Sequence, residues 1–79
     1  MQVLRGHGDY VKTINELPDN KLASGSYDKT VKLWNIGDGS LKTTIDIQDT
    51  VRSICSIKKN KIAVGCGSGT IKAYDVTTK

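Results

Sequence analysis

The sequence is a tandem repeat in which a unit of 40 residues occurs twice, with no gap between the copies. When residues 1–39 are aligned with residues 41–79, nine positions are identical, and others pair similar side chains such as Trp34 with Tyr74. The identical pairs are Asp9/Asp49, Val11/Val51, Ile14/Ile54, Asn20/Asn60, Lys21/Lys61, Ala23/Ala63, Gly25/Gly65, Thr30/Thr70 and Lys32/Lys72. One unit of a repeat protein cannot bury its hydrophobic face alone, and about three stacked units are normally needed for stability. Two units therefore predict a chain that needs further units around it.

The residue pattern inside each unit predicts short strands joined by tight turns. Runs rich in β-branched and apolar residues are bounded by turn-forming sequences such as Pro18-Asp19-Asn20 and Gly37-Asp38-Gly39, and no window carries a helical stripe. Short strands at regular intervals predict an all-β sandwich, barrel or propeller. The 40-residue period selects the propeller.

Residues 4–36 resemble a WD40 repeat, a unit of roughly 40–45 residues that forms a four-stranded propeller blade. The matching positions, in family order, are Gly6-His7, Asp9, Val11, Ala23-Ser24-Gly25-Ser26, Asp28 and Leu33-Trp34-Asn35. Asn35 stands where the family has the aspartate that gives it its name. The resemblance is strong in the first repeat and moderate in the second, and it implies an all-β chain of two four-stranded antiparallel blades.

The resemblance also implies that each repeat begins with the outer strand of the preceding blade. We expect repeat one over residues 1–40, with an outer strand over 2–5 and inner strands over 11–17, 21–26 and 30–36. Repeat two then covers residues 41–79, with an outer strand over 41–45 and inner strands over 51–57, 61–66 and 70–76. In this register the strand over 41–45 completes the first blade, and the second blade lacks an outer strand of its own.

Two blades leave apolar faces and sheet edges exposed to water, which is an aggregation hazard. We expect the chain to solve this by head-to-tail homo-oligomerisation, with residues 2–5 of each copy completing the last blade of its neighbour. Such contacts close into rings when the rotation between copies closes. Closed propellers have typically 4–8 blades, so three or four copies fit, and we favour four.

A serine, a lone histidine and an aspartate in one chain invite interpretation as a nucleophilic triad. The family resemblance implies a structural network instead, in which His7 bridges Asp28 and a strand serine that also accepts a hydrogen bond from the indole of Trp34. The sequence leaves Ser24 and Ser26 open as that serine, with a narrow preference for Ser24. In repeat two these positions hold Ile47, Val64, Cys66, Ser68 and Tyr74, so we expect that blade to be held by apolar packing of Ile54, Ile57, Ile62, Val64, Ile71 and Val76.

In the family register, one rim of the ring is lined by the residues around the start of each first inner strand. These candidate binding residues are Tyr10, Lys12, Tyr27, Thr50, Arg52 and Gly67. Aromatic side chains and Arg dominate binding hot spots, although Lys12 and Arg52 serve equally well as solvated surface charges. With a net charge of +4, the rim predicts a protein-interaction scaffold for an acidic or phosphorylated peptide.

Two other functions remain open at this point. The same charge would serve nucleic-acid or anionic-lipid binding, and the chain could also be a purely structural propeller fragment or engineered unit with no ligand. Nothing in the sequence indicates an enzyme, a cofactor or a metal site. Cys55 and Cys66 do not have zinc-ligand spacing, and we expect both to be buried reduced thiols. No signal peptide or membrane span is visible, so we expect an intracellular protein, cytoplasmic or nuclear.

Overall fold

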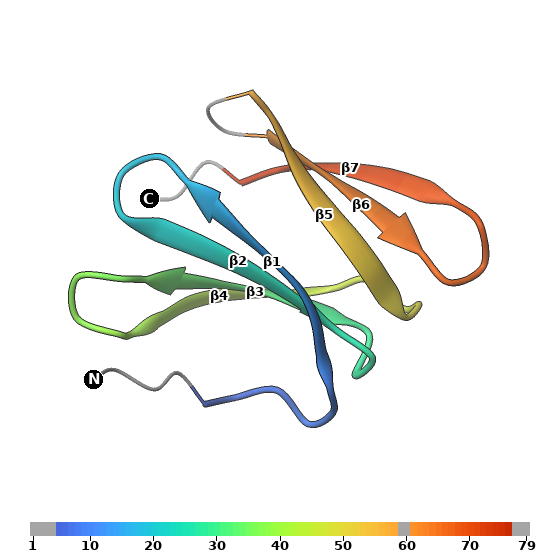
Figure 1. Ribbon diagram of the computed structural model, residues 1–79, viewed down its shortest axis with the longest axis horizontal. Coiled ribbons are helices and arrows are strands. Elements are labelled where there is room, and N and C mark those ends of the chain that lie inside the picture. The colour runs from blue at the N-terminus through green and yellow to red at the C-terminus, as the bar shows by residue number, and fades with distance from the viewer. Residues whose placement is uncertain (1–4, 59–60, 77–79) are drawn as a thin grey trace.

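The computed structural model describes residues 5–58 and 61–76, which form seven β-strands in two antiparallel sheets (Figure 1). The first sheet has the order β1-β2-β3-β4 and the second the order β5-β6-β7. The strands are β1 (Val11–Leu17), β2 (Lys21–Ser26), β3 (Thr30–Asn35), β4 (Leu41–Asp46), β5 (Val51–Lys58), β6 (Lys61–Cys66) and β7 (Ile71–Asp75). The strands expected over 30–36, 41–45, 51–57 and 70–76 differ from these by one residue at their ends.

The first sheet is a four-stranded blade whose outermost strand, β4, comes from the second repeat. β3 and β4 pair antiparallel, with Val31 opposite Ile45 and Leu33 opposite Thr43. Within the described part of the chain the second sheet has three strands and not the four of a complete blade, which matches the register in which the second blade lacks an outer strand of its own. The expected outer strand over 2–5 lies outside the described residues except for Arg5, which is not in a strand.

The turns place left-handed backbone where the residues tolerate it. Asp19 and Asn20 have φ values of 66° and 60° between β1 and β2, and such residues accept this conformation because their short side chains bond locally. Lys29 between β2 and β3 has a φ of 72°, and its repeat equivalent Gly69 has a φ of 93°. In both turns this residue donates its N–H to the last residue of the preceding strand, Ser26 or Cys66. The two repeats therefore build the same turn.

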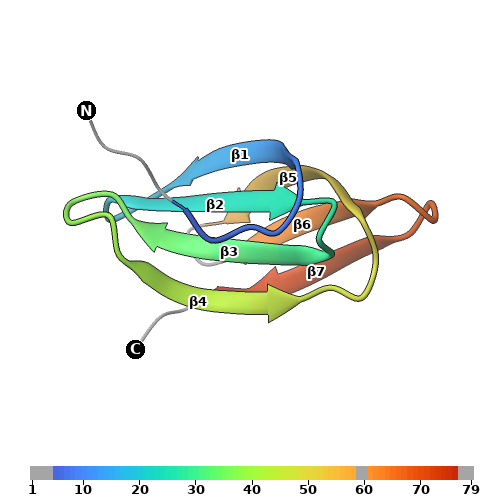
Figure 2. The same ribbon diagram turned by 90° about the horizontal axis from the view of Figure 1, so that it is seen from below.

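A single hydrophobic core lies between the two sheets, which stack as two layers (Figure 2). Its buried members are Leu17, Ala23, Val31, Leu33, Ile47, Val51, Ile54, Ile62, Val64, Cys66 and Val76. Ile57 and Ile71 do not join this core, contrary to expectation, because they belong to the exposed face of the second sheet. Cys66 is buried as expected, but Cys55 is exposed, since it follows the buried Ile54 on a strand whose successive side chains alternate between faces.

Candidate functional site

The segment before β1 runs across β2 and β3 (Figure 2), so that His7 bonds to Ser24 of β2 and Gly6 lies beside Trp34 of β3. Gly6 allows this close crossing, because a Cβ at that position would lie 3.1 Å from the indole atom Cη2 of Trp34 and 3.6 Å from the side chain of Lys32. A larger side chain would therefore lift the segment away from the sheet.

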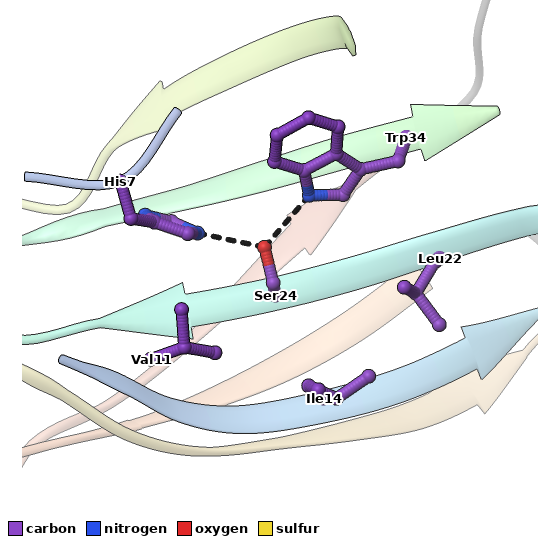
Figure 3. A pocket seen from close by; sticks show the side chains of 6 residues that line it. All are labelled: His7, Val11, Ile14, Leu22, Ser24 and Trp34. Carbon is purple, nitrogen blue, oxygen red and sulfur yellow. Dashed lines mark hydrogen bonds between the residues drawn. The ribbon is translucent and has the colours of Figure 1, made fainter. Parts of the chain in front are cut away.

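Hydrogen bonds join four side chains from separate parts of repeat one, and Figure 3 shows three of them, His7, Ser24 and Trp34. The indole Nε1 of Trp34 donates to Ser24 Oγ at 2.8 Å, and Ser24 Oγ lies 2.7 Å from Nε2 of His7. On its other side, Nδ1 of His7 lies 3.0 Å from Oδ2 of Asp28. An ionised carboxylate only accepts, so Nδ1 carries a proton. In the tautomer that has its only ring proton there, the Ser24 hydroxyl donates to Nε2. Each polar side-chain atom of these four residues therefore has a hydrogen-bond partner. We call these four residues the His–Ser–Asp–Trp network.

Asp28 is the anchor at the turn end of this network. Burial by itself would raise the pKa of Asp28, but hydrogen bonds from Thr30, the backbone N–H of Gly8 and His7 outweigh it and hold the pKa well below its usual range. The N–H of Gly8 donates to Oδ2 at 2.9 Å, while Oδ1 accepts from the hydroxyl and N–H of Thr30 at 2.5 and 3.0 Å. A carboxylate held by several donors stays ionised because each bond favours the charged form.

The structure separates the two candidate serines. Ser24 bonds to both His7 and Trp34, whereas Ser26 accepts the backbone N–H of its own turn residue, Asp28, at 3.0 Å. Sequence reasoning did not include Thr30 in the network. Its position two residues after Asp28 was the available signal, because aspartate side chains commonly accept from backbone two residues ahead.

The second repeat replaces the network with apolar contacts and keeps one polar remnant. Ile47 is fully buried at the position of His7, and Lys72 donates to the Ile47 carbonyl at 2.9 Å. The remnant consists of Ser68, which donates to Asp49 and lies 3.2 Å from the hydroxyl of Thr70. None of the four network residues recurs in repeat two, and only the contact between Ser68 and Thr70 corresponds to the one that Asp28 makes with Thr30.

The arrangement of serine, histidine and aspartate also resembles a nucleophilic triad, but its surroundings favour a structural use. Ser24 is 5% exposed, and its oxygen already accepts the Trp34 indole proton. A nucleophile needs access to its substrate and donors for the developing oxyanion. Elsewhere, no three His, Cys, Asp or Glu side chains among residues 5–58 and 61–76 gather in a way that could hold a metal ion.

A shallow apolar hollow of about 210 Å³ lies on the outer face of the first blade, beside the network (Figure 3). It is lined by His7, Val11, Ile14, Leu22, Ser24 and Trp34. Val11 and Ile14 are 50% and 61% exposed, so this side of the first sheet presents apolar side chains to solvent.

The expected rim residues lie where the strands β1 and β5 begin, and the structure brings them together in pairs. The rings of Tyr10 and Tyr27 meet edge to face with centroids 6.4 Å apart, and the Tyr27 N–H donates to the Tyr10 carbonyl at 3.1 Å. In repeat two the N–H of Gly67 donates to the Thr50 carbonyl at 2.9 Å. Lys12 and Arg52, each the second residue of its strand, are exposed.

Antiparallel sheets that repeat at a fixed period and pack face to face are the blades of a β-propeller. Residues 1–35 match the family model described as "WD domain, G-beta repeat". The first repeat of the chain is therefore a WD40 repeat. No helix in the described part of the chain is long and apolar enough to cross a membrane.

Relatives and solved structures agree with this placement. A "Ribosome biogenesis protein BOP1 homolog" of Drosophila virilis is 43% identical over 70 residues, which are 84% of this chain and 9% of the relative. The chain thus spans about a tenth of the length of the curated relatives it matches. The WD40 β-propeller domain of Doa1 superposes with a TM-score of 0.87 at 27% identity, over 92% of this chain and 25% of that one. The computationally designed Ika4 protein superposes with a TM-score of 0.82 at 29% identity, over 94% of this chain and 46% of that one.

Proposed function

We propose that the chain is a non-enzymatic protein-interaction scaffold whose binding surface is the rim formed by Tyr10, Lys12, Tyr27, Thr50 and Arg52. The single observation that carries this proposal is the contact between the rings of Tyr10 and Tyr27, because it holds a large exposed aromatic surface in place. Tyr10 is 77% exposed although its ring is held by a neighbour. Rigid, exposed aromatic residues are typical anchors of binding energy.

The partner that this rim favours is an acidic or phosphorylated peptide. Lys12 follows Tyr10 by two residues, and Arg52 is its equivalent in repeat two, so both rim segments carry positive charge in a chain with a net charge of +4. Cationic groups beside aromatic rings bind phosphate and carboxylate groups through charge-assisted hydrogen bonds. Positive charge at the rim also raises the association rate with acidic ligands.

Binding of phosphorylated and unphosphorylated acidic peptides, measured by fluorescence anisotropy, tests this function. We expect Tyr27→Ala to weaken peptide binding at least about tenfold, because hot-spot aromatic residues contribute more than 1 kcal/mol. Lys42→Ala removes an exposed positive charge from β4, outside the rim, and should leave the affinity within about twofold. Equal losses in both variants would count against the rim.

A nucleic-acid ligand is the second candidate, and the similarity to relatives named for ribosome biogenesis favours it. A role of that kind would place the chain inside the cell, in cytoplasm or nucleus. Binding to nucleic acid falls steeply and linearly with the logarithm of salt concentration, across many sequences. Steep salt dependence without sequence preference would support this second function, whereas one peptide motif bound with modest salt dependence would support the first.

The scaffold needs further blades, and we propose that it obtains them by closing a propeller with copies of itself, four being favoured over three. β7 is the repeat equivalent of β3, which pairs with β4 in the first blade. Residues 2–5 are equivalent to residues 42–45 of β4, so we expect those of a neighbouring copy to pair with β7. Light scattering on a size-exclusion column should therefore give three or four times the 8.6 kDa of one chain. A single-chain mass would contradict this assembly while leaving the peptide test in place. A defined oligomer with no ligand would instead indicate a purely structural unit.

A further inference from the structure

The interface between the two blades joins opposite faces of the repeat unit. The first blade contributes what we call its covering face, and the second blade its receiving face. The covering face of blade one consists of Thr13, Ala23, Gly25, Val31 and Leu33. The receiving face of blade two consists of Val51, Ile54, Ile62, Val64 and Cys66.

Two contacts define how these faces meet. Gly25 lies so close to blade two that a Cβ on it would approach Val51 Cγ1 to 2.3 Å and Ile54 Cδ1 to 3.1 Å. Beside it, the hydroxyl of Thr13 accepts the backbone N–H of Ile54 at 3.3 Å. The absence of a side chain at Gly25 thus lets the sheets approach, and Thr13 supports the strand opposite it.

Each blade also has the other type of face. Among the described residues, no second sheet packs on the receiving face of blade one or on the covering face of blade two. The receiving face of blade one contains Val11 and Ile14, the equivalents of Val51 and Ile54, and they line the apolar hollow. The covering face of blade two contains Ser53, Gly65 and Ile71, the equivalents of Thr13, Gly25 and Val31.

The exposures of these counterparts differ from those of the internal interface. Val31 is fully buried between the sheets, whereas Ile71 is 78% exposed. The three nearest atoms to a Cβ on Gly65 all belong to Ser53 of its own sheet, the hydroxyl oxygen at 2.6 Å, whereas those at Gly25 include two atoms of the other sheet. Ser53 keeps the hydroxyl that Thr13 uses in the internal interface.

We propose that the covering face of blade two in one copy packs on the receiving face of blade one in a second copy and so repeats the internal blade interface between chains. This inference rests on the proposed self-assembly and specifies its junction. Gly65 of one copy meets Val11 and Ile14 of the other, Ile71 packs beside the hollow, and Ser53 accepts the N–H of Ile14. Because the two faces differ, the junction is head-to-tail and each copy uses one of each.

Single charged substitutions on the two faces test this junction by light scattering. Ile14→Glu blocks the receiving face, and Ile71→Lys blocks the covering face, while both residues are mostly exposed within one chain. We expect each variant to run as a single chain of 8.6 kDa under conditions in which the natural sequence is an oligomer. As a control, Gln48→Lys introduces the same positive charge as Ile71→Lys, but at an exposed position in the β4–β5 connection, and should leave the oligomer intact.

Mixing the two variants gives a sharper readout. The Ile14→Glu copy retains a usable covering face, and the Ile71→Lys copy retains a usable receiving face. An equimolar mixture should therefore form a 1:1 pair of twice the single-chain mass and no larger species. A junction that joined like faces would let each variant pair with itself, so dimers of either variant alone, or a mixture that stays as single chains, would overturn the proposal.

The thiol of Cys55 provides an independent readout in chains that carry Cys66→Ala. Cys55 is exposed on the second sheet and is the repeat equivalent of Asn15, a partly buried residue of β1. Its labelling by a thiol reagent should be slow in the oligomer and at least about tenfold faster in Ile14→Glu, although the substitution lies on the other face. An oligomer that persists unchanged in both single variants, with Cys55 equally reactive throughout, would overturn this junction and leave self-assembly standing. A natural chain that is monomeric at all concentrations would overturn both.

Discussion

Nε2 of His7 lies 2.7 Å from Oγ of Ser24, and this contact joins the segment before β1 to the second strand of the first blade. The serine accepts the indole proton of Trp34 and donates its own, so the chain of hydrogen bonds runs in one direction from Trp34 to Asp28. A network in which each member is satisfied fixes the position of a loop, whereas a partly satisfied network is costly.

Removing the imidazole should therefore destabilise the chain. His7→Ala removes the partner of the Ser24 hydroxyl proton and one of the donors to Asp28, and we expect a loss of about 1–3 kcal/mol in the free energy of unfolding. Urea unfolding followed by Trp34 fluorescence at fixed protein concentration measures it. The result to compare is Ile47→Ala at the equivalent position, which opens a cavity in the core and should cost about 2–5 kcal/mol. A neutral His7→Ala would contradict a stabilising role for the network.

Replacing the network as a whole should cost less than its parts. The triple variant His7→Ile, Ser24→Val, Trp34→Tyr carries the residues that repeat two has at these positions. Removing both partners of a buried hydrogen bond avoids leaving one unsatisfied, so we expect the triple loss to fall below the sum of the three single losses by at least about 1 kcal/mol. Strict additivity in urea unfolding would show that the residues do not act together.

The lowered pKa of Asp28 predicts a specific acid sensitivity. Asp28 stays ionised in the folded chain at a pH where the unfolded chain, with its carboxyl pKa near about 4, binds a proton. Its contribution to stability is thus complete above about pH 4 and is lost as the pH falls further toward the folded pKa. Asp28→Asn should be less stable than the natural chain at pH 6, and the difference should shrink between pH 4 and pH 2. Asp38 and Asp49 also have lowered pKa values but are present in both proteins, so they cancel in the comparison.

Gly25 should tolerate no side chain. A Cβ there would overlap Val51 Cγ1 of the second sheet and approach Thr13 Cγ2 to 2.9 Å, so Gly25→Ala must push the sheets apart. Overpacking of this kind costs about 1–3 kcal/mol. Gly8→Ala is the matched control, since a Cβ at Gly8 has no neighbour within 4 Å. Thermal melts that show equal effects would mean that the sheets do not approach as closely as described.

Much of the fold follows from local sequence. Turn formers at Asp19-Asn20 and at Gly69 mark the hairpins, and the repeat register places β4 beside β3. The local sequence pattern did not predict which face of each strand packs against the other sheet. Ile54 and Ile71 look alike in sequence, yet one lies in the core and the other on the open face of blade two, because burial depends on which neighbouring blade is present.

The site shows the same division. The family resemblance named His7, Asp28 and Trp34, but the choice of Ser24 over Ser26 required the geometry of β2 and β3, on which Trp34 is paired with Leu22 and its indole reaches Ser24. The sequence did not single out Thr30, because threonine is common in strands. Its position alone does not distinguish an ordinary strand residue from a donor to Asp28.

The core that lies between the two sheets has a consequence for how the chain unfolds. Leu33 of one repeat and Ile62 of the other belong to the same buried cluster, so neither sheet has an interior of its own. Loss of either sheet exposes half of that cluster at once, and amide protons in β2 and β6 should therefore exchange through the same opening event. The repeat is the unit of sequence, whereas the smallest cooperative unit of this chain is the pair.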